Sequence, residues 1–137
     1  MMEDIEKDER SLIVIINNIK GNFNRLNLIL EKLNYKLHLD YLILTGEVFN
    51  SQTKEEDLFK INFIKTTIIF DSSSFGEKIR AKNEYNNYIL KNFIFLSRSG
   101  IFTPRNSSIN FAFLSGNEIK ELLDKNYNQQ SYPNVNK

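Results

Sequence analysis

The chain contains no cysteine, and this absence excludes several kinds of chemistry. Without thiols there can be no disulfide, no thiolate metal site and no cysteine nucleophile. A chain without cysteine also fits a reducing compartment. His38 is the single histidine, so no site that needs more than one imidazole can be built from this chain.

Long apolar runs and a large excess of one charge are missing as well. No run approaches the roughly 18 apolar residues of a membrane-spanning helix. Residues 1–10 are acidic and polar, and the apolar run Leu12 to Ile16 is too short for the core of a signal peptide, so we expect an intracellular protein. The net charge of +1 gives no global argument for binding nucleic acid or an anionic membrane, while a local basic patch stays open.

The size and composition indicate one globular domain. A chain of 137 residues is long enough to bury one sizeable core, and an apolar fraction of 41% is ordinary for a globular protein. We expect the domain to cover residues 11–126, between a flexible N-terminal segment at 1–10 and a loose tail at 127–137.

Apolar runs alternate with amphipathic segments along the chain. The continuous apolar run at 12–16, which is β-branched from Ile13 onward, is typical of a strand that is buried on both faces. A helix over about 22–34 follows it, capped by Asn22 or Asn24. The alternation predicts an α/β fold with a mostly parallel sheet, flanking helices and a C-terminal antiparallel hairpin. Further strands are predicted at 41–44, 66–70, 93–96 and 109–114, and further helices around 58–59, in part of the polar segment before Leu90, and from 115–118 onward.

Polar loops follow the first three predicted strands, at 17–21, 45–47 and 71–74. Ligands of open α/β sheets bind beyond the carboxyl ends of the strands, so we expect these loops to lie close together. Lys20 and Arg98 are candidates for phosphate binding, because a glycine-containing loop that enters a helix offers free N–H groups to anions. The alternative is that both are solvated turn residues.

Three other features have ordinary structural interpretations. Glu47 could ligate one ion or pair with Lys20, and the pair is preferred. Asp71 to Ser74 is interpreted as a helix N-cap with turn residues in preference to a ligand loop. His38 precedes the second strand, at the end opposite the polar loops, which favours a structural or surface role. Five phenylalanines could offer a stacking platform for RNA, but their interleaving with Ile and Leu favours core packing: Phe93, Phe95, Phe102, Phe111 and Phe113.

Several segments carry a resemblance to a known family. They are Ile19 to Phe23, Asp40 to Phe49, and the pair Phe95 to Thr103 with Phe113 to Glu118. A buried strand, a polar turn with glycine, an Asn-rich helix start and a strand ending in Gly plus a carboxylate resemble the metallophosphoesterase layout. Over most of its length the chain is similar to the N-terminal, metallophosphoesterase-like domain of the Cwf-nineteen-like proteins, spliceosome-associated partners of the lariat debranching enzyme.

The resemblance implies a metal site whose ligands have been replaced. Asn18 stands where the enzymes carry their first Asp, and Lys20 where they carry their first His. Glu47 takes the place of the Gly-Asp carboxylate, while Asp71 and Ser72 lie at about the Gly-Asn-His motif. A two-metal centre needs several carboxylates and imidazoles, and a lysine in a ligand position repels a cation. We therefore expect no catalytic residue, no metal and no cofactor.

The function that the resemblance implies is a non-catalytic, metallophosphoesterase-like binding domain in pre-mRNA splicing or intron lariat turnover. Its partners would be the lariat debranching enzyme or late spliceosome proteins, with RNA as a further candidate and no membrane. The location would be the nucleus, with the cytoplasm in addition. Two alternatives stay open: a phosphodiesterase or nuclease that uses Glu47 and Asp71, and an RNA- or nucleotide-binding domain that uses Lys20, Arg98 and the strand-end loops.

Overall fold

A computed structural model describes residues 11–83, 87–104 and 108–114, which form two compact units divided between Ser97 and Arg98. The expected N-terminal segment, the helix from 115 onward and the tail lie outside the described residues. The first unit contains β1 (Ile13–Asn17), α2 (Phe23–Lys36), β2 (Tyr41–Gly46), η1 (Glu55–Lys60), β3 (Thr66–Asp71), α3 (Ser74–Arg80), η2 (Ala81–Asn83), β4 (Tyr88–Leu90) and β5 (Phe93–Phe95). The second unit contains β6 (Ser99–Phe102) and β7 (Phe111–Leu114).

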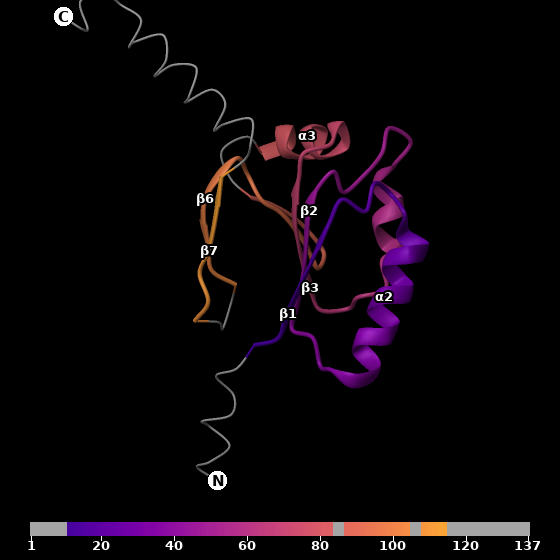
Figure 1. The fold of residues 1–137 in the computed structure, drawn as a ribbon. Helices are drawn as coiled ribbons and strands as arrows, with labels where there is room; N and C mark the ends of the chain where they lie inside the picture. The colour runs from indigo at the N-terminus through magenta and orange to yellow at the C-terminus, as the bar shows by residue number, and fades with distance from the viewer. Residues whose placement is uncertain (1–10, 84–86, 105–107, 115–137) are drawn as a thin grey trace, which may run out of the picture. The chain divides into compact units, whose positions relative to one another are not determined.

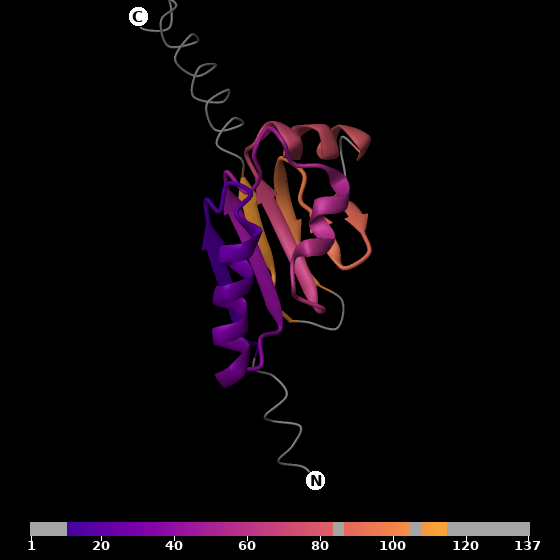
Figure 2. The same cartoon turned by 90° about the vertical axis from the view of Figure 1, so that its right-hand side faces the viewer.

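The first unit is built on one twisted sheet with the strand order β1-β2-β3-β5-β4 (Figure 1). β1, β2, β3 and β5 run parallel, and only β4 is antiparallel to its neighbour. α2 and η1 cover one face of this sheet, which Figure 2 shows from the helix side. In the second unit, β6 and β7 form an antiparallel hairpin. The predicted α/β class, the mostly parallel sheet and the later hairpin are thus confirmed.

α2 forms where the sequence predicts it and is capped at its start. The side chain of Asn22 accepts a hydrogen bond of 3.1 Å from the N–H of Arg25, so Asn22 is the N-cap. Leu26 and Leu30 are buried against the sheet, one turn apart on the same side of the helix. Within the described part of the chain, no helix combines the length and hydrophobicity that a membrane crossing requires.

The core lies between the sheet and these helices. Phe49 is fully buried at its centre, with its ring centroid 4.8 Å from that of Phe75 and 6.3 Å from that of Phe95. Phe93 and Phe95 are both buried, as core packing predicts. The remaining phenylalanines of the predicted set are half-buried on the hairpin of the second unit: Phe102, Phe111 and Phe113.

One prediction about the strands is wrong, and one strand was not predicted. β1 is not buried on both faces, because it is the edge strand of the sheet and Ile15 is 64% exposed. A run of β-branched residues reports a preference for strand geometry, not the number of neighbours that the strand acquires. The prediction that the polar segment before Leu90 is helical in part is confirmed by α3 and η2. Its last three residues form strand β4, which was not predicted and pairs with β5 through the tight turn at Lys91 and Asn92. The side-chain amide of Asn92 fixes this turn by donating to the carbonyls of Phe63 and Lys65.

Candidate functional site

The loops that follow β1, β2 and β3 meet at the carboxyl ends of the strands, as predicted. The side-chain oxygen of Asn18 accepts a hydrogen bond of 2.8 Å from the N–H of Glu47. The N–H of Lys20 donates to the carbonyl of Glu47 over 2.9 Å, and the N–H of Ser72 donates to the carbonyl of Gly46 over 2.8 Å. These bonds, together with the pairing of β2 and β3, bring five of the six candidate positions together: Asn18, Lys20, Glu47, Asp71 and Ser72.

Arg98, the sixth candidate, belongs to the second unit, where it precedes β6. Its side chain is exposed. The site built from the strand-end loops is consequently described from residues of the first unit alone.

The prediction that Glu47 pairs with Lys20 is wrong. The two residues are joined by their backbones, and no ion pair links their side chains, both of which are exposed. An exposed pair of this kind would gain little in water, since solvent and salt screen the attraction. Lys20 also holds a left-handed backbone conformation, with φ of 52°, and Asn18 does so with φ of 58°. The loop therefore presents the Lys20 ammonium to solvent instead of directing it to Glu47.

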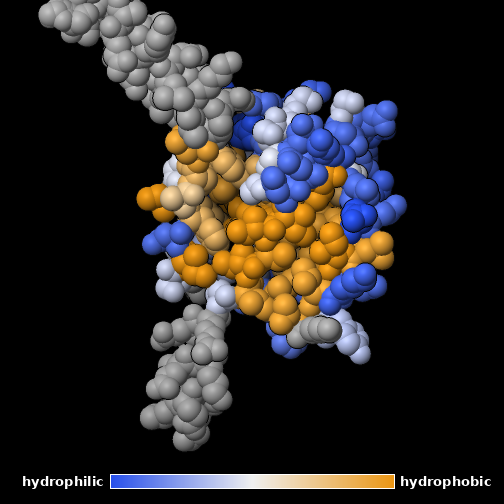
Figure 3. Space-filling view, in the orientation of Figure 1, coloured by the Kyte–Doolittle hydropathy of each residue, from blue (hydrophilic) through white to orange (hydrophobic). Residues whose placement is uncertain are grey.

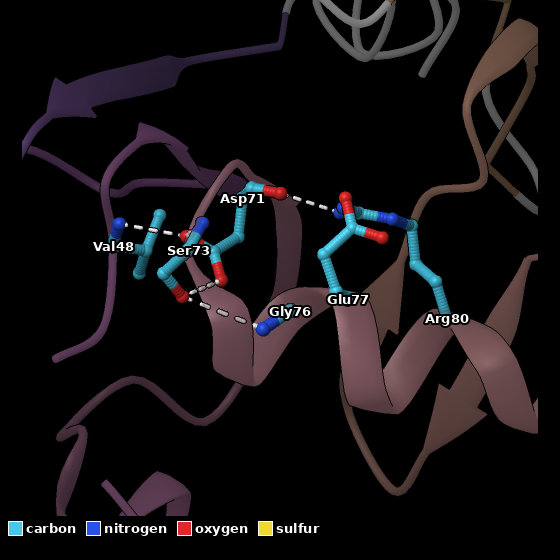
Figure 4. A network of polar contacts seen from close by, with 6 residues as sticks. All are labelled: Val48, Asp71, Ser73, Gly76, Glu77 and Arg80. Atoms are coloured by element: carbon cyan, nitrogen blue, oxygen red, sulfur yellow. Dashed lines mark hydrogen bonds and ion pairs between the residues drawn. The ribbon is translucent and has the colours of Figure 1, made fainter. Parts of the chain in front are cut away.

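Asp71 is engaged by its own chain. It is only 3% exposed, and its Oδ1 accepts hydrogen bonds from the N–H of Val48 (2.8 Å) and of Ser73 (3.0 Å). Its Oδ2 accepts a hydrogen bond of 2.5 Å from the hydroxyl of Ser73 (Figure 4). A carboxylate has about four lone-pair positions, and three are occupied here by donors from the fold itself.

The same residues start α3. Ser73 is its N-cap and accepts a long hydrogen bond of 3.4 Å from the N–H of Gly76. A Cβ at Gly76 would lie 2.3 Å from Oδ2 of Asp71, so only glycine fits against the carboxylate. Arg80 donates to the carbonyl of Asp71 and pairs with Glu77 at 2.8 Å (Figure 4). The interpretation of 71–74 as a helix cap is confirmed, and Asp71 is its buried anchor.

These residues do not fit a two-metal centre. Among the described residues there is no group of three or more His, Cys, Asp or Glu side chains placed to hold a metal ion. The carboxylate of Asp71 faces donors, Glu47 is exposed, and Lys20 brings a cation to the same loops. His38 is exposed in the link between α2 and β2, at the other end of the strands.

A pocket of about 440 Å³ lies beside these loops, between the end of β1 and the start of α2. Its apolar wall includes Ile16 and Ile29, and its cations are Lys20 and Arg25. No carboxylate occurs among the described residues that line it. The pocket therefore combines an apolar surface with two positive charges beside a helix N-terminus, a composition that suits an anionic group on an apolar body.

Sequence reasoning missed two residues of this region. Arg25 could have been found, because it lies four residues before Ile29 and three after the cap, on the side of the helix that faces the loop. Asn50 gave no local signal: its amide donates to the carbonyl of Lys20 over 3.3 Å across 30 residues of sequence. A Cβ at Gly21 would lie 2.3 Å from that amide nitrogen, so the loop and Asn50 are closely packed.

Known proteins give no family assignment for the chain: a scan against protein-family models found no match, and a search of curated proteins found none.

Proposed function

We propose that this chain is a non-catalytic binding domain with a metallophosphoesterase-like layout, and that it acts through protein partners. The burial of Asp71 and its three hydrogen bonds to the fold carry the proposal. A metal ligand must offer a free lone pair that the ion can reach, whereas donors from Val48 and Ser73 occupy three of the roughly four lone-pair positions of this buried carboxylate. Lys20, in the loop beside it, adds a positive charge that opposes a bound cation.

The resemblance to the Cwf-nineteen-like domains supplies the setting of the proposal. In that setting the domain works in pre-mRNA splicing or lariat turnover in the nucleus, and its partners are the lariat debranching enzyme or late spliceosome proteins. The alternative of a phosphodiesterase is less well supported, because Glu47 is exposed while Asp71 is buried and bound. The two carboxylates therefore do not face a shared open space.

Calorimetric titration with Mn²⁺ and Zn²⁺, combined with hydrolysis of a phosphodiester such as bis(p-nitrophenyl) phosphate, tests the proposal. We expect no stoichiometric binding and no turnover above the rate of the buffer. Glu47→Ala provides the matched variant, since its side chain is exposed and its loss should leave the fold intact. Stoichiometric metal binding with turnover that Glu47→Ala abolishes would contradict the proposal and make the domain an enzyme.

The cationic pocket favours binding of RNA or a nucleotide as a second candidate function. Lys20 and Arg25 would contact phosphate groups, and the apolar wall would contact a base. Binding of a single-stranded RNA should then weaken steeply with salt, and Lys20→Ala should reduce the slope by roughly 0.7, the contribution of one phosphate contact. Lys65→Ala, at the amino end of β3, is the control and should leave the slope unchanged.

A further inference from the structure

The outer edge of β1 has no partner strand among the described residues, since β1 stands first in the sheet. The carbonyl of Leu12 and the N–H of Asn18 bond to β2. In a parallel pair alternate residues face the neighbour, so Val14 and Ile16 also bond to β2. The backbone N–H and C=O groups of Ile13, Ile15 and Asn17 therefore point away from the sheet. They form an open ladder onto which another strand can bond.

The surface around this ladder is apolar. Figure 3, which looks toward the outer edge of β1, shows hydrophobic residues gathered over the strand and the adjoining side of α2. Ile15 is 64% exposed, and Leu12 and Ile29 are 38% and 36% exposed. Natural edge strands are usually short or carry a charge, a proline or a bulge, but Ile13–Asn17 has neither charge nor proline. The opposite edge, β4, has only three residues.

Cations border this apolar strip. Lys20 follows the end of β1, and Arg25 lines the same pocket as Ile16 and Ile29. Lys32 lies seven residues after Arg25, two turns along the same side of α2. Asp40, at the other end of β1, is already engaged: it accepts from the N–H of Leu12 and pairs with Lys65. Among the described residues, the charges that line the pocket at this edge are therefore those of Lys20 and Arg25, and the nearest exposed carboxylate is that of Glu47 in the neighbouring loop.

We propose that β1 receives an added strand from a partner protein, and that the partner segment is extended, alternately apolar and flanked by acidic residues. The proposal deepens the proposed function, on which it rests, by naming the binding surface and the chemistry of the partner. Main-chain bonds to Ile13, Ile15 and Asn17 provide the affinity, and an acidic side chain reaches the pocket that holds Lys20 and Arg25. The apolar side chains of the added strand cover Ile15 and its neighbours.

Charge disfavours a second copy of this chain as the occupant. Two copies that pair antiparallel through β1 about a twofold axis would place α2 alongside its counterpart. Ile29 would then approach Ile29 of the copy. Arg25 of each copy would approach Lys32 of the other. Like charges brought together in this way oppose pairing, whereas a partner with acidic residues gains from the same cations.

Amide hydrogen exchange followed by ¹H–¹⁵N NMR tests the proposal, with a synthetic peptide at millimolar concentration as the probe. The peptide alternates valine and threonine between two terminal glutamates, and a second peptide carries lysines in place of the glutamates. We expect the glutamate peptide to protect the amides of Ile13, Ile15 and Asn17 and to leave Val14 and Ile16 unchanged, since these already bond to β2. The lysine peptide should bind about fivefold more weakly, as expected for the loss of contacts with exposed cations.

Ile15→Lys and Ile64→Lys form the matched pair of variants. Both side chains are exposed, at 64% and 94%, so both proteins should fold. Ile15→Lys places a charge on the edge and should weaken peptide binding about tenfold, while Ile64→Lys, between η1 and β3, should leave it unchanged.

Four results would overturn the proposal. Two concern the peptides: no new protection at the three outward amides, or equal affinity for both peptides. The third is protection of those amides that rises with protein concentration alone, and the fourth is a change in the NMR signals of Lys20 and Arg25 on addition of an RNA oligomer with none on addition of the peptides. None of these changes the metal and hydrolysis assays, so failure of this proposal is distinguishable from failure of the proposed function. Turnover in those assays would contradict the proposed function, and the protection of the three outward amides would still report whether a strand is added to β1.

Discussion

The backbone N–H of Val48 donates to the carboxylate of Asp71 over 2.8 Å, and this bond ties the loop after β2 to the last residue of β3. Ser73, the N-cap of α3, adds two further donors. A carboxylate that occupies the expected ligand position is thus used to hold two loops and a helix together. Its role in the structure is measurable as stability.

Asp71→Ala should destabilise the protein strongly. The substitution leaves the N–H groups of Val48 and Ser73 buried without an acceptor, and we expect the free energy of unfolding to fall by about 2–4 kcal/mol. Urea unfolding measures the change. Glu47→Ala removes an exposed carboxylate from the neighbouring loop and should change stability by less than about 0.5 kcal/mol. Equal effects of the two substitutions would show that Asp71 does not anchor the site.

Gly76→Ala should act against the usual preference of helices. In an exposed helix interior, alanine stabilises relative to glycine by about 1 kcal/mol. In α3 the new Cβ would meet Oδ2 of Asp71 at 2.3 Å, so we expect a loss of about 1–3 kcal/mol in thermal or urea unfolding. Lys78→Ala, on the exposed side of the same helix, should be nearly neutral. A stabilised Gly76→Ala protein would contradict the contact.

Asn22→Ala and Asn24→Ala distinguish the two candidate caps of α2. Only Asn22 accepts the hydrogen bond from the N–H of Arg25, so its replacement should cost about 1 kcal/mol of unfolding free energy. Asn24 lies inside the first turn, where alanine is the better helix former, and its replacement should be neutral or slightly stabilising. Thermal unfolding of the two variants, monitored by circular dichroism, gives the comparison. The reverse order would place the helix start two residues later.

Asp57 should make the stability depend on pH. The N–H of Lys54 donates to its carboxylate over 2.9 Å and, with the ammonium of Lys60, holds the pKa of Asp57 below its usual value. A lowered pKa in the folded state stabilises above the unfolded pKa of about 3.9, and this contribution is lost as the pH falls through the folded value.

The stability gap between wild type and Asp57→Ala, measured by urea unfolding, should accordingly be constant near neutral pH and shrink below about pH 4. Glu56→Ala, its exposed neighbour in η1, is the control for the general effect of removing a carboxylate. A gap for Asp57→Ala that stays the same at acidic and neutral pH would exclude this linkage.

The sequence predicts the parallel strands well because their apolar runs are long and end at turn residues. It fails at Tyr88–Leu90, since three residues are too few for a recognisable pattern. This strand also depends on the turn that Asn92 stabilises through its hydrogen bonds to the carbonyls of Phe63 and Lys65. It also fails to place β1 at the edge, because a strand's neighbours depend on how distant segments pack.

The candidate site was predictable to a similar extent. The meeting of the three loops follows from the parallel order of the strands, so the positions of Asn18, Lys20 and Glu47 could be foreseen. The burial of Asp71 could not, since it depends on Val48 and on the absence of a side chain at Gly76. The wrong ion pair of Glu47 with Lys20 has the same origin: proximity follows from topology, but side-chain direction follows from local backbone angles.

The bonds around Lys20 also affect the entropy of any binding event at this end of the sheet. Its N–H and carbonyl are held by Glu47 and Asn50, and the next N–H, that of Gly21, is held by Val48, which in turn bonds Asp71. The backbone at Lys20 and Gly21 is therefore held by hydrogen bonds before a ligand arrives, and the loss of freedom on binding falls mainly on the lysine and arginine side chains. We therefore expect the affinity and the heat-capacity change of binding to be determined by the groups that come into contact, with little entropy lost in ordering the loop.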